Sequence, residues 1–549
     1  MSGVVTATIL SKGKKMNSEY NVMSIDIIKE VNKIPIAQII LLDGDAAEQE
    51  FAISNTEFFK PGQEIEIKLR YEAEKQNEAT VFKGIIVRHC VQADRYSSLL
   101  TVDLKDAAYK LTTQRKSAVF RDMTDKDIIG KVINTGGGGL KFKSSAVTKP
   151  KHKEMVQYYC TDWDFILSRG DVNGLWVLVD DGEITVKEPN LTKTEEAKHT
   201  FEYGKDEIYQ FEMEADICDQ KASVESTAWD IKTQKLSQSQ KAKEFSLEQG
   251  NLKGDELAKT IGADNYQLIS LAPLDDQEVK AWADAKLQKS RLSLFKGRLN
   301  LPGFADIKPG DMIKIKGIGK RFNGKTLVTA IRHQFSRQGW QTYVQFGLSA
   351  SWFYQQTNDI IDTPVAGLIP AIHGLQIGIV DKYEADPEKQ FRVKVRIPSI
   401  ETDGIVWARL ASVEAGNKRG IFFRPETGDE VILGFINDDP RQAIILGAVH
   451  SGKNALPPGL TVTKENNKKG IVTKNSLKLI FDDENQLIEI STGKGNTFKL
   501  SEQDKGIKLE DENGNTITMD NQGIKIKSSK DIVMEGNYIK IKGSRVDIN

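Results

Sequence analysis

Residues 477–527 read LKLIFDDENQLIEISTGKGNTFKLSEQDKGIKLEDENGNTITMDNQGIKIK, and their pattern predicts the structure of the C-terminal part. Short runs of alternating apolar and polar residues are separated by Gly, Asn and Asp. A period of two predicts half-buried β-strands joined by turns. The motif IKIK begins at residue 524 and again at residue 539, so the pattern continues to the end of the chain.

Strands of this kind have one thin apolar face, and nothing in the same segment is thick enough to cover it. Open strands also invite pairing with other chains. We therefore predict that identical chains cover one another and form an intertwined, trimeric β-helix needle over residues 460–549. Ile524, Ile526, Ile539 and Ile541 should face the shared axis, with the intervening lysines in solvent. A flat solenoid within one chain is the alternative.

The N-terminal part shows a repeated turn and strand. Residues 60–68 read KPGQEIEIK and residues 308–316 read KPGDMIKIK, so each has a Pro-Gly turn before a strand of period two. The two turns lie 308 − 60 = 248 positions apart. We expect a duplicated β-barrel, at about residues 1–115 and 290–350, with an α+β insertion between the copies. Together these segments form a predicted hub domain over residues 1–355.

A pair of Arg-His dipeptides follows the repeated turns. Arg88-His89 and Arg332-His333 lie 332 − 88 = 244 positions apart, which suggests that they are equivalent. A repeated pair inside a strand favours a structural contact over catalysis. In the insertion, Asp275 and Glu278 predict a capping box for a helix whose apolar face we expect to pack on the second barrel.

The remaining middle of the chain is again rich in strands. Residues 356–373 are polar and contain two prolines, which is typical of a linker. Residues 374–452 contain several short strands and predict a small barrel of the OB type. Its aromatic residues are most simply explained as core residues: Phe391, Trp407, Phe422, Phe423 and Phe435. The fold class is therefore mainly β, with two hub barrels, an OB barrel and a needle.

Composition excludes several functions. Lys and Arg number 76 and Asp and Glu 77, so the cationic surface of a nucleic-acid-binding protein is missing, and the OB segment has a slight acidic excess. Three cysteines and six histidines show no metal-binding spacing. The glycines at 136–139 lack the lysine and hydroxyl of a phosphate loop. We predict no catalytic residue, no cofactor and no metal.

Paired carboxylates do not change this prediction. Asp180-Asp181 and Asp482-Asp483 are adjacent in sequence, and adjacent side chains on a strand point to opposite faces. We interpret both pairs as turn residues. About twenty residues separate the OB segment from the needle, which is too few to bury an enzyme core, so we expect that the protein is not an enzyme.

Four segments resemble the VgrG and phage-spike family. QYYCTDWDFILSR at residues 157–169 is similar to a hub motif of that family, and RPETGDEVILGF at residues 424–435 with NDDPRQAIILGAV at residues 437–449 resembles its OB strands. A proline common in the family is absent, where this chain has Gln442-Ala443. The duplicated Pro-Gly turn and the C-terminal strand repeat are the other two segments. The segments occur along the chain in the same order as in the family.

The resemblance implies the central spike of a contractile injection machine. It implies a homotrimer whose six barrels meet a hexameric inner tube protein, contacts with baseplate proteins, an OB neck, and a needle that carries a PAAR-type tip protein and pierces a target membrane mechanically. Effector cargo is a further expected partner. A short needle favours an extracellular injection particle over a type VI secretion system.

Two other functions remain alternatives. One is an OB-fold module that binds nucleic acid or carbohydrate, and the other is a spike with a cell-wall hydrolase activity. We also expect synthesis in the bacterial cytoplasm without a signal peptide, because the apolar stretch near the N-terminus is short. Export would then follow assembly into an injection particle that is extracellular or spans the cell envelope. The C-terminus has no His-x-His motif, so we expect a metal-free tip.

Overall fold

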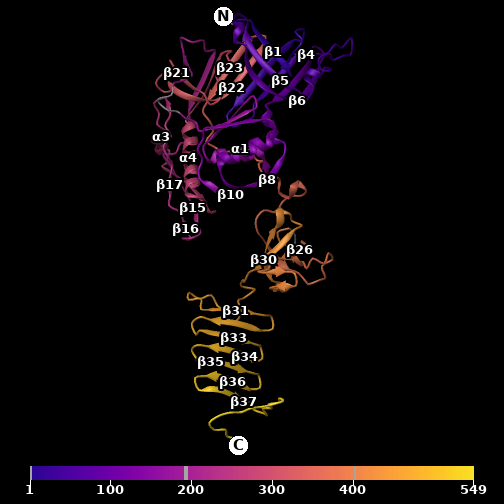
Figure 1. Ribbon diagram of the computed structural model, residues 1–549, viewed down its shortest axis with the longest axis vertical. Coiled ribbons are helices and arrows are strands. Elements are labelled where there is room, and N and C mark those ends of the chain that lie inside the picture. Colours follow the sequence, from indigo (N-terminus) through magenta and orange to yellow (C-terminus); the bar gives the residue numbers. More distant parts are fainter. Residues whose placement is uncertain (1–2, 191–195, 401–403, 549) are drawn as a thin grey trace. The chain divides into compact units, whose positions relative to one another are not determined.

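The computed structural model describes residues 3–190, 196–400 and 404–548. The chain divides into two compact units, Met1–Asp362 and Thr363–Asn549, which are described separately. Strands dominate both units (Figure 1), so the predicted mainly β fold class is confirmed. Within the described residues, no helix is both long and apolar enough to cross a membrane.

The first barrel is built from strands near the N-terminus. Their core side chains alternate with polar ones, as the sequence pattern predicts, and Ile27, Ile39, Ile65 and Phe82 are fully buried. The strands are β1 (Val5–Ser11), β2 (Lys14–Lys15), β3 (Val22–Glu30), β4 (Ile36–Leu42), β5 (Glu64–Tyr71), β6 (Ala79–Ala93) and β7 (Ser98–Lys105).

The second barrel has its own core, which includes Leu299, Ile313 and Val344. It takes strands from the insertion as well as from residues 290–350, because β13, β14 and β18 pair with later strands. Its strands are β13 (His199–Glu202), β14 (Gln210–Ala215), β18 (Glu248–Gln249), β20 (Phe295–Pro302), β21 (Met312–Lys316), β22 (Gly324–Ser336) and β23 (Gly339–Phe346). The two barrels form one continuous sheet, joined by antiparallel pairing of β22 with β3.

The two Pro-Gly turns have the same hydrogen bonds. Gly62 has a φ of +90° and its N–H donates to the Ile86 carbonyl oxygen at 2.8 Å. Gly310 has a φ of +87° and its N–H donates to the Val328 carbonyl oxygen at 2.7 Å. Positive φ favours glycine, so the repeated glycine has a physical cause.

The turns show that the Arg-His pairs are not equivalent. They place Ile86 at the position of Val328, and a β-bulge follows both residues. Arg88 therefore corresponds to Ala330, and the equivalence that the sequence suggested for the two pairs is wrong by two residues. His333 is buried and accepts from or donates to the Thr342 hydroxyl at 3.1 Å, whereas His89 contacts Ser54.

The insertion has two α+β parts, which follow each other along the chain. The first contains β8 (Arg115–Thr124), α1 (Asp125–Gly136), β9 (Lys141–Ser144), β10 (Lys151–Thr161), α2 (Asp162–Val172), β11 (Trp176–Asp180) and β12 (Glu183–Lys187). The second contains β15 (Ser223–Asp230), β16 (Lys235–Leu236), β17 (Gln240–Lys241), α3 (Gly254–Thr260), β19 (Asn265–Ser270) and α4 (Asp276–Leu292). A short helix, α5 (Phe353–Gln356), ends the unit's regular structure.

Helix α4 differs from the prediction in two ways. Its N-cap, Asp275, accepts from the Gln277 N–H, but no capping box forms because the Glu278 side chain bonds Arg169 instead. Its apolar face packs on Val224 and Leu268 of the adjacent β15–β19 sheet, rather than on the second barrel. The strands of the insertion are the nearer apolar surface.

The second unit begins with the OB-type barrel, which closes in the order β24-β25-β26-β30-β29. Its core contains Val380, Val395, Ala408, Leu433 and Ile445. The strands are β24 (Gln376–Val380), β25 (Val393–Arg396), β26 (Ile405–Leu410), β29 (Glu430–Phe435) and β30 (Ala443–Ala448), with a small hairpin of β27 (Ala415–Gly416) and β28 (Arg419–Gly420).

The C-terminal strands form a seven-stranded antiparallel meander in sequence order. They are β31 (Lys468–Val472), β32 (Lys478–Asp482), β33 (Leu487–Ser491), β34 (Thr497–Ser501), β35 (Gly506–Glu510), β36 (Thr516–Asp520) and β37 (Gly523–Lys527). Because each strand pairs with the next one of the same chain, the intertwining expected for this segment is wrong at the level of hydrogen bonds. Intertwined strands stay a prediction for residues 528–548.

Candidate functional site

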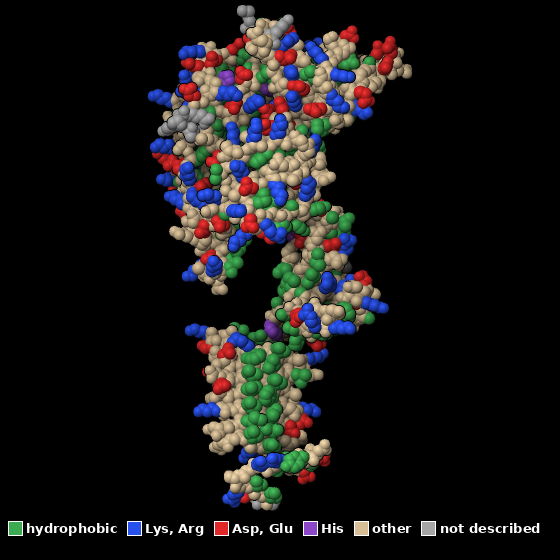
Figure 2. Space-filling view, in the orientation of Figure 1, with side chains coloured by type: hydrophobic (Ala, Val, Ile, Leu, Met, Phe, Trp, Pro, Cys, Tyr) green, Lys and Arg blue, Asp and Glu red, His purple; other side chains and the backbone are tan. Residues whose placement is uncertain are grey.

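The meander places its hydrophobic side chains in two parallel rows. In the first row each residue lies directly opposite the next: Ile471, Leu479, Ile490, Phe498, Leu509, Ile517 and Ile526. The second row is Phe481, Ile488, Leu500, Ile507, Met519 and Ile524. Residues two apart on a strand share a face, so both rows lie on one side of the sheet. We call it the apolar face, and it forms the hydrophobic stripe over β31 to β37 in Figure 2.

None of the described residues buries the apolar face. Among the described residues beyond Ile445, no hydrophobic side chain is buried. Ile490 is 49% exposed, Ile526 56% and Ile524 70%. A continuous apolar surface of this length marks an interaction site in a folded protein.

The opposite side of the meander is polar. A cross-strand row there runs through Glu489, Lys499 and Lys508. The Lys499 ammonium lies 3.3 Å from the Glu489 carboxylate, so neighbouring charges on this side pair with each other. The polar side can therefore face water, and the apolar face can pack against protein. This agrees with the prediction that Ile524 and Ile526 point away from the solvent.

Residues 528–548 follow the meander without regular secondary structure. Several of their apolar side chains are exposed, including Val533 at 74%, Tyr538 at 79% and Ile541 at 63%. Together with the apolar face, these side chains give the C-terminal region an extended apolar surface that is exposed in the single chain.

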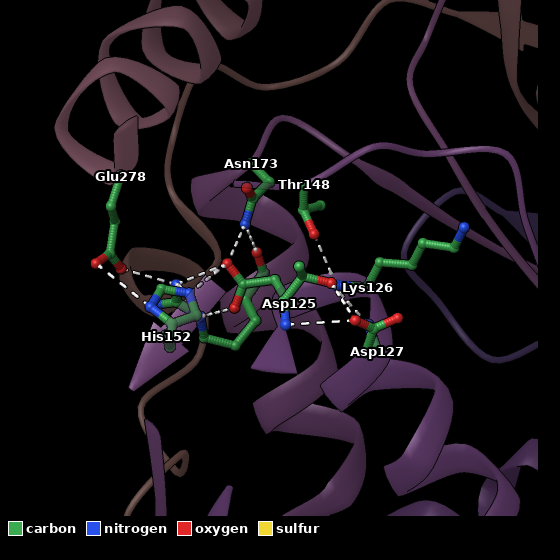
Figure 3. Close-up of polar contacts among 9 residues, drawn as sticks. Asp125, Lys126, Asp127, Thr148, His152, Asn173 and Glu278 are labelled. Carbon is green, nitrogen blue, oxygen red and sulfur yellow. Dashed lines mark hydrogen bonds and ion pairs between the residues drawn. The ribbon is translucent and has the colours of Figure 1, made fainter. Parts of the chain in front are cut away.

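The hub contains a buried group of charged residues, shown in Figure 3. Asp125, at the start of α1, is 1% exposed and accepts hydrogen bonds from Arg169 at 2.7 and 2.9 Å, from Asn173 at 2.9 Å and from His152 at 3.1 Å. Arg169 also donates to Glu278 of α4 at 2.8 Å. The group therefore joins α1, β10, α2 and α4.

This buried group is a structural junction rather than a reactive site. Burial alone would raise the pKa of Asp125, but the hydrogen bonds from His152 and Arg169 outweigh it and hold this pKa well below its ordinary value. The carboxylate is ionised and its oxygens are occupied. Each of its two oxygens accepts at least one hydrogen bond from within the group.

The hub motif that carries the family resemblance supplies this junction. Asp162 begins α2, accepts from the Gln157 amide at 3.0 Å and pairs with Lys116 at 2.5 Å. Phe165 is buried, and Arg169 is the cation bonded to Asp125. Asp162, Phe165 and Arg169 of the motif thus lie on successive turns of one helix. The spacing of these residues in the sequence did not indicate which contacts they make.

The paired carboxylates have structural partners. Asp180 is bonded by Lys29 and by Lys308 at 2.6 Å, which outweigh burial and lower its pKa. Asp482 accepts from Asn485 in the turn after β32. Among the residues that the structure describes, no group of three or more His, Cys, Asp and Glu side chains is placed to hold a metal ion.

The OB barrel departs from the prediction in its aromatic residues. Phe391 is 85% exposed, Phe422 74% and Phe423 59%, so the interpretation of these three as core residues is wrong. Phe391 follows a turn and has a φ of +59°, and Phe422 and Phe423 follow the β27–β28 hairpin, so none belongs to a barrel strand. Trp407 and Phe435 are partly buried, and Phe435 packs against the core.

Comparison with known families defines the class of protein. Residues 376–450 match the model described as the type VI secretion system/phage-baseplate injector OB domain. Residues 487–549 match the phage baseplate V C-terminal trimerisation domain, which contains most of the apolar face. The chain is thus a spike protein of the VgrG and phage-baseplate class. It belongs to the family described by the Alg8 N-terminal domain, whose model matches residues 1–337.

Individual relatives are more distant. The type VI secretion system spike protein VgrG3 of Vibrio cholerae is 38% identical over 74 residues, which are 13% of this chain and 7% of the length of VgrG3. The superposition with a tail protein from Neisseria meningitidis covers 63% of this chain and 98% of the tail protein, with 15% identity and a TM-score of 0.46. A Francisella PdpA–VgrG complex covers 95% of this chain and 87% of its own, with 8% identity and a TM-score of 0.41. Membership of the class rests on the family models.

Proposed function

We propose that this chain is the homotrimeric hub and spike of a contractile injection machine. The observation that carries the proposal is the apolar face, two rows of Ile, Leu, Phe and Met that remain uncovered by the part of the chain that the structure describes. Three copies with these faces turned to a common axis would bury them in a rigid prism. The match of residues 487–549 to a trimerisation domain supports the number three.

Burial of this face supplies a large driving force. A fully buried Ile, Leu or Phe side chain contributes roughly 1.5–3 kcal/mol relative to exposure. The side chains of the two rows are already partly covered by their neighbours, so the gain is smaller for each. The whole face still contributes on the order of 10 kcal/mol per chain, which suits a needle that must stay folded under mechanical load.

The hub would join two symmetries. Each chain has two barrels with the same turn and the same strand order, so a trimer presents six similar barrels. Six barrels match a hexameric inner tube protein, and three apolar faces match a threefold needle. Baseplate proteins around the hub, a PAAR-type tip protein on the needle, effector cargo and a mechanically pierced membrane are the further partners that this role requires.

The proposed role is not enzymatic. Residues 451–467, between the OB barrel and β31, contain no helix or strand and no buried hydrophobic side chain, so they offer no core for a hydrolase domain. The buried charges of the hub are mutually paired. The proposed spike would be made in the bacterial cytoplasm and leave the cell only within the assembled particle.

Nucleic-acid binding is less well supported. Exposed Phe422 and its neighbour Arg424, which lies 5.8 Å from the ring centre, are groups that can stack on bases. The OB segment nevertheless has an excess of acidic residues, whereas a groove for single strands needs positive charge. Contact with protein explains these side chains better. Tight and salt-sensitive retention of single-stranded DNA in a filter-binding assay would reverse this conclusion.

Deletion of residues 471–549 tests the proposal. Light scattering should show that the shortened protein dissociates at concentrations at which the full chain stays trimeric, because its apolar face is gone. A matched control removes residues 544–549 only and should leave the mass unchanged. Equal stability of the full and the shortened trimer would contradict the role given to the apolar face.

A further inference from the structure

Among the described residues of the hub, two strands with an open edge are β14, at one end of the sheet, and the part of β6 that extends beyond β5. β14 pairs with β20 on one side only, and residues 88–93 of β6 pair only with β7. These edges are exposed: Val91 and Phe211 are each 38% accessible. Open edges of this kind pair readily with other chains, and folded proteins normally cover or blunt them.

The two barrels have equivalent strand orders. The first follows β3-β4-β7-β6-β5, and the second follows β14-β20-β23-β22-β21. The equivalence holds residue by residue, because Ile86 lies opposite Leu104 and Val328 lies opposite Phe346, each just before the same bulge. By this equivalence β6 corresponds to β22, and β3 corresponds to β14.

The strand equivalence defines two contacts, β22 with β3 and β6 with β14, and the described chain forms the first of them. β22 extends past the end of β21 and pairs there with β3, which joins the barrels within the chain. β6 likewise extends past the end of β5, but its counterpart partner, β14, lies at the far end of the sheet. We propose that β6 of one chain pairs antiparallel with β14 of the next chain, repeating the β22–β3 contact and closing the hub ring.

The hydrogen-bonding phase of both edges agrees with this pairing. The Asp94 N–H donates to the Ser97 carbonyl oxygen, toward β7, so alternation along the strand turns the backbone groups of His89, Val91 and Ala93 to the open edge. The Asp216 N–H donates to the Leu294 carbonyl oxygen, toward β20. The same alternation turns the backbone groups of Phe211, Met213 and Ala215 outward.

The internal contact also gives the register. His333 lies opposite Ile27 and Arg332 opposite Ile28. Translated to the equivalent residues, Val91 lies opposite Met213, and Ala93 opposite Phe211, which makes two apolar pairs; Val91, Ala93 and Phe211 are exposed in the single chain, and Met213 is partly buried. Arg88 lies opposite Asp216, a pair of opposite charge. The His89 ring contacts Ser54 and the Phe59 carbonyl through its side chain and leaves the strand edge open.

The pairing is head to tail, since different surfaces of each chain meet. A heterologous contact of this kind makes a ring when its rotation closes. The inference rests on the proposed trimeric hub and adds the strands and the register that hold neighbouring chains together. It also explains why the insertion supplies β14: without that strand the second barrel has no counterpart of β3 to offer the next chain.

A disulfide trap tests the register. The equivalence places Glu214 opposite the native Cys90 in a pair without mutual hydrogen bonds, at a Cα separation of about 4.5 Å, which a disulfide can bridge. The full-length variant Glu214→Cys with Cys218→Ser should form covalent trimers on mild oxidation, seen on a non-reducing gel. Replacement of Cys90 by Ser in the same protein should abolish them.

The matched control is Glu212→Cys with Cys218→Ser, which moves the thiol to a diagonal position about 7–8 Å from Cys90. It should give at least tenfold less covalent trimer. A protein that light scattering shows to be trimeric, with accessible thiols but no cross-link or equal cross-linking at 212, would overturn the β6–β14 pairing alone. A monomer would overturn the proposed trimeric hub together with it.

Discussion

In the needle, the apolar or polar character of a single side chain shows which side of the sheet it lies on. Ile526 lies on the apolar face, opposite Ile517, and Lys527 lies next to it on the polar face. The alternation of apolar and polar side chains at this position could be predicted from the sequence, because a strand with the motif IKIK places both isoleucines on one side and both lysines on the other. The exposure of Ile526 in one chain, 56%, gives the reason for expecting a partner over it.

Replacing Ile526 by Asp should destabilise the needle strongly. Three carboxylates would meet near a common axis, and each uncompensated buried charge costs several kcal/mol. The variant should lose resistance to protease and melt at a lower temperature than the parent. Lys527→Asp is the control and should change the melting temperature little. If the two variants melt alike, the assignment of faces is mistaken.

Arg169 should be essential for the stability of the hub. Arg169→Met leaves Asp125 as a buried carboxylate without its cation, which costs about 3–5 kcal/mol of the free energy of unfolding. The double variant Asp125→Asn with Arg169→Met should recover part of this loss, because no unpaired charge remains between them. Chemical denaturation measures both. A purely additive double variant would show that the two groups are not coupled.

The same carboxylate makes hub stability depend on acid pH. The pKa of Asp125 is lower in the folded protein than its ordinary value near 3.9, so this group stabilises the fold above that value and the stabilisation is lost as the pH falls below it. The variant Asp125→Asn should therefore be less stable at pH 7 and lose less stability between about pH 4 and pH 2. Identical pH profiles would contradict this.

At the scale of elements, sequence patterns predicted strands better than their partners. Pro61-Gly62 and Pro309-Gly310 marked turns whose geometry demands glycine, so the start of β5 and of β21 was predictable. The pairing of β14 with β20 joins residues far apart in sequence and has no local signal. The Arg-His pairs misled because the segment between the Pro-Gly turn and the long strand differs in length between the two barrels, so Arg88 corresponds to Ala330 and not to Arg332.

The aromatic residues of the OB segment show a second limit. An apolar side chain in a small barrel is expected inside, but Phe422 and Phe423 follow a hairpin rather than a strand and point outward. The buried junction around Asp125 was also missed, because its members come from α1, β10, α2 and α4. The spacing of Asp162 and Arg169 was its only signal in the sequence.

Residues 544–549 should be needed for binding of a tip protein but not for assembly of the trimer. Arg545 and Asp547 form an exposed ion pair at 2.8 Å, and no His-x-His motif is present after His450. Truncation after Gly543 should abolish binding of the tip protein and injection while the trimer stays assembled. Co-purification of the tip protein with the truncated spike, or stoichiometric iron or zinc in the full trimer, would contradict the expected metal-free platform.

At the scale of the whole molecule, one property connects the hub and the needle. The open edges of β6 and β14 and the apolar face of β31–β37 lie in different units, yet each is completed by further copies of the same chain. A monomer would leave both uncovered. Both surfaces therefore need a definite number of chains in the assembled protein.

The molar mass of the purified full-length protein in solution tests this most directly. Multi-angle light scattering at micromolar concentration should give a single species near three times 61.3 kDa, because the apolar face and the strand edges are then covered. The mass should not fall on dilution over a hundredfold range. A stable, folded species near 61.3 kDa would contradict the needle and the hub arguments alike.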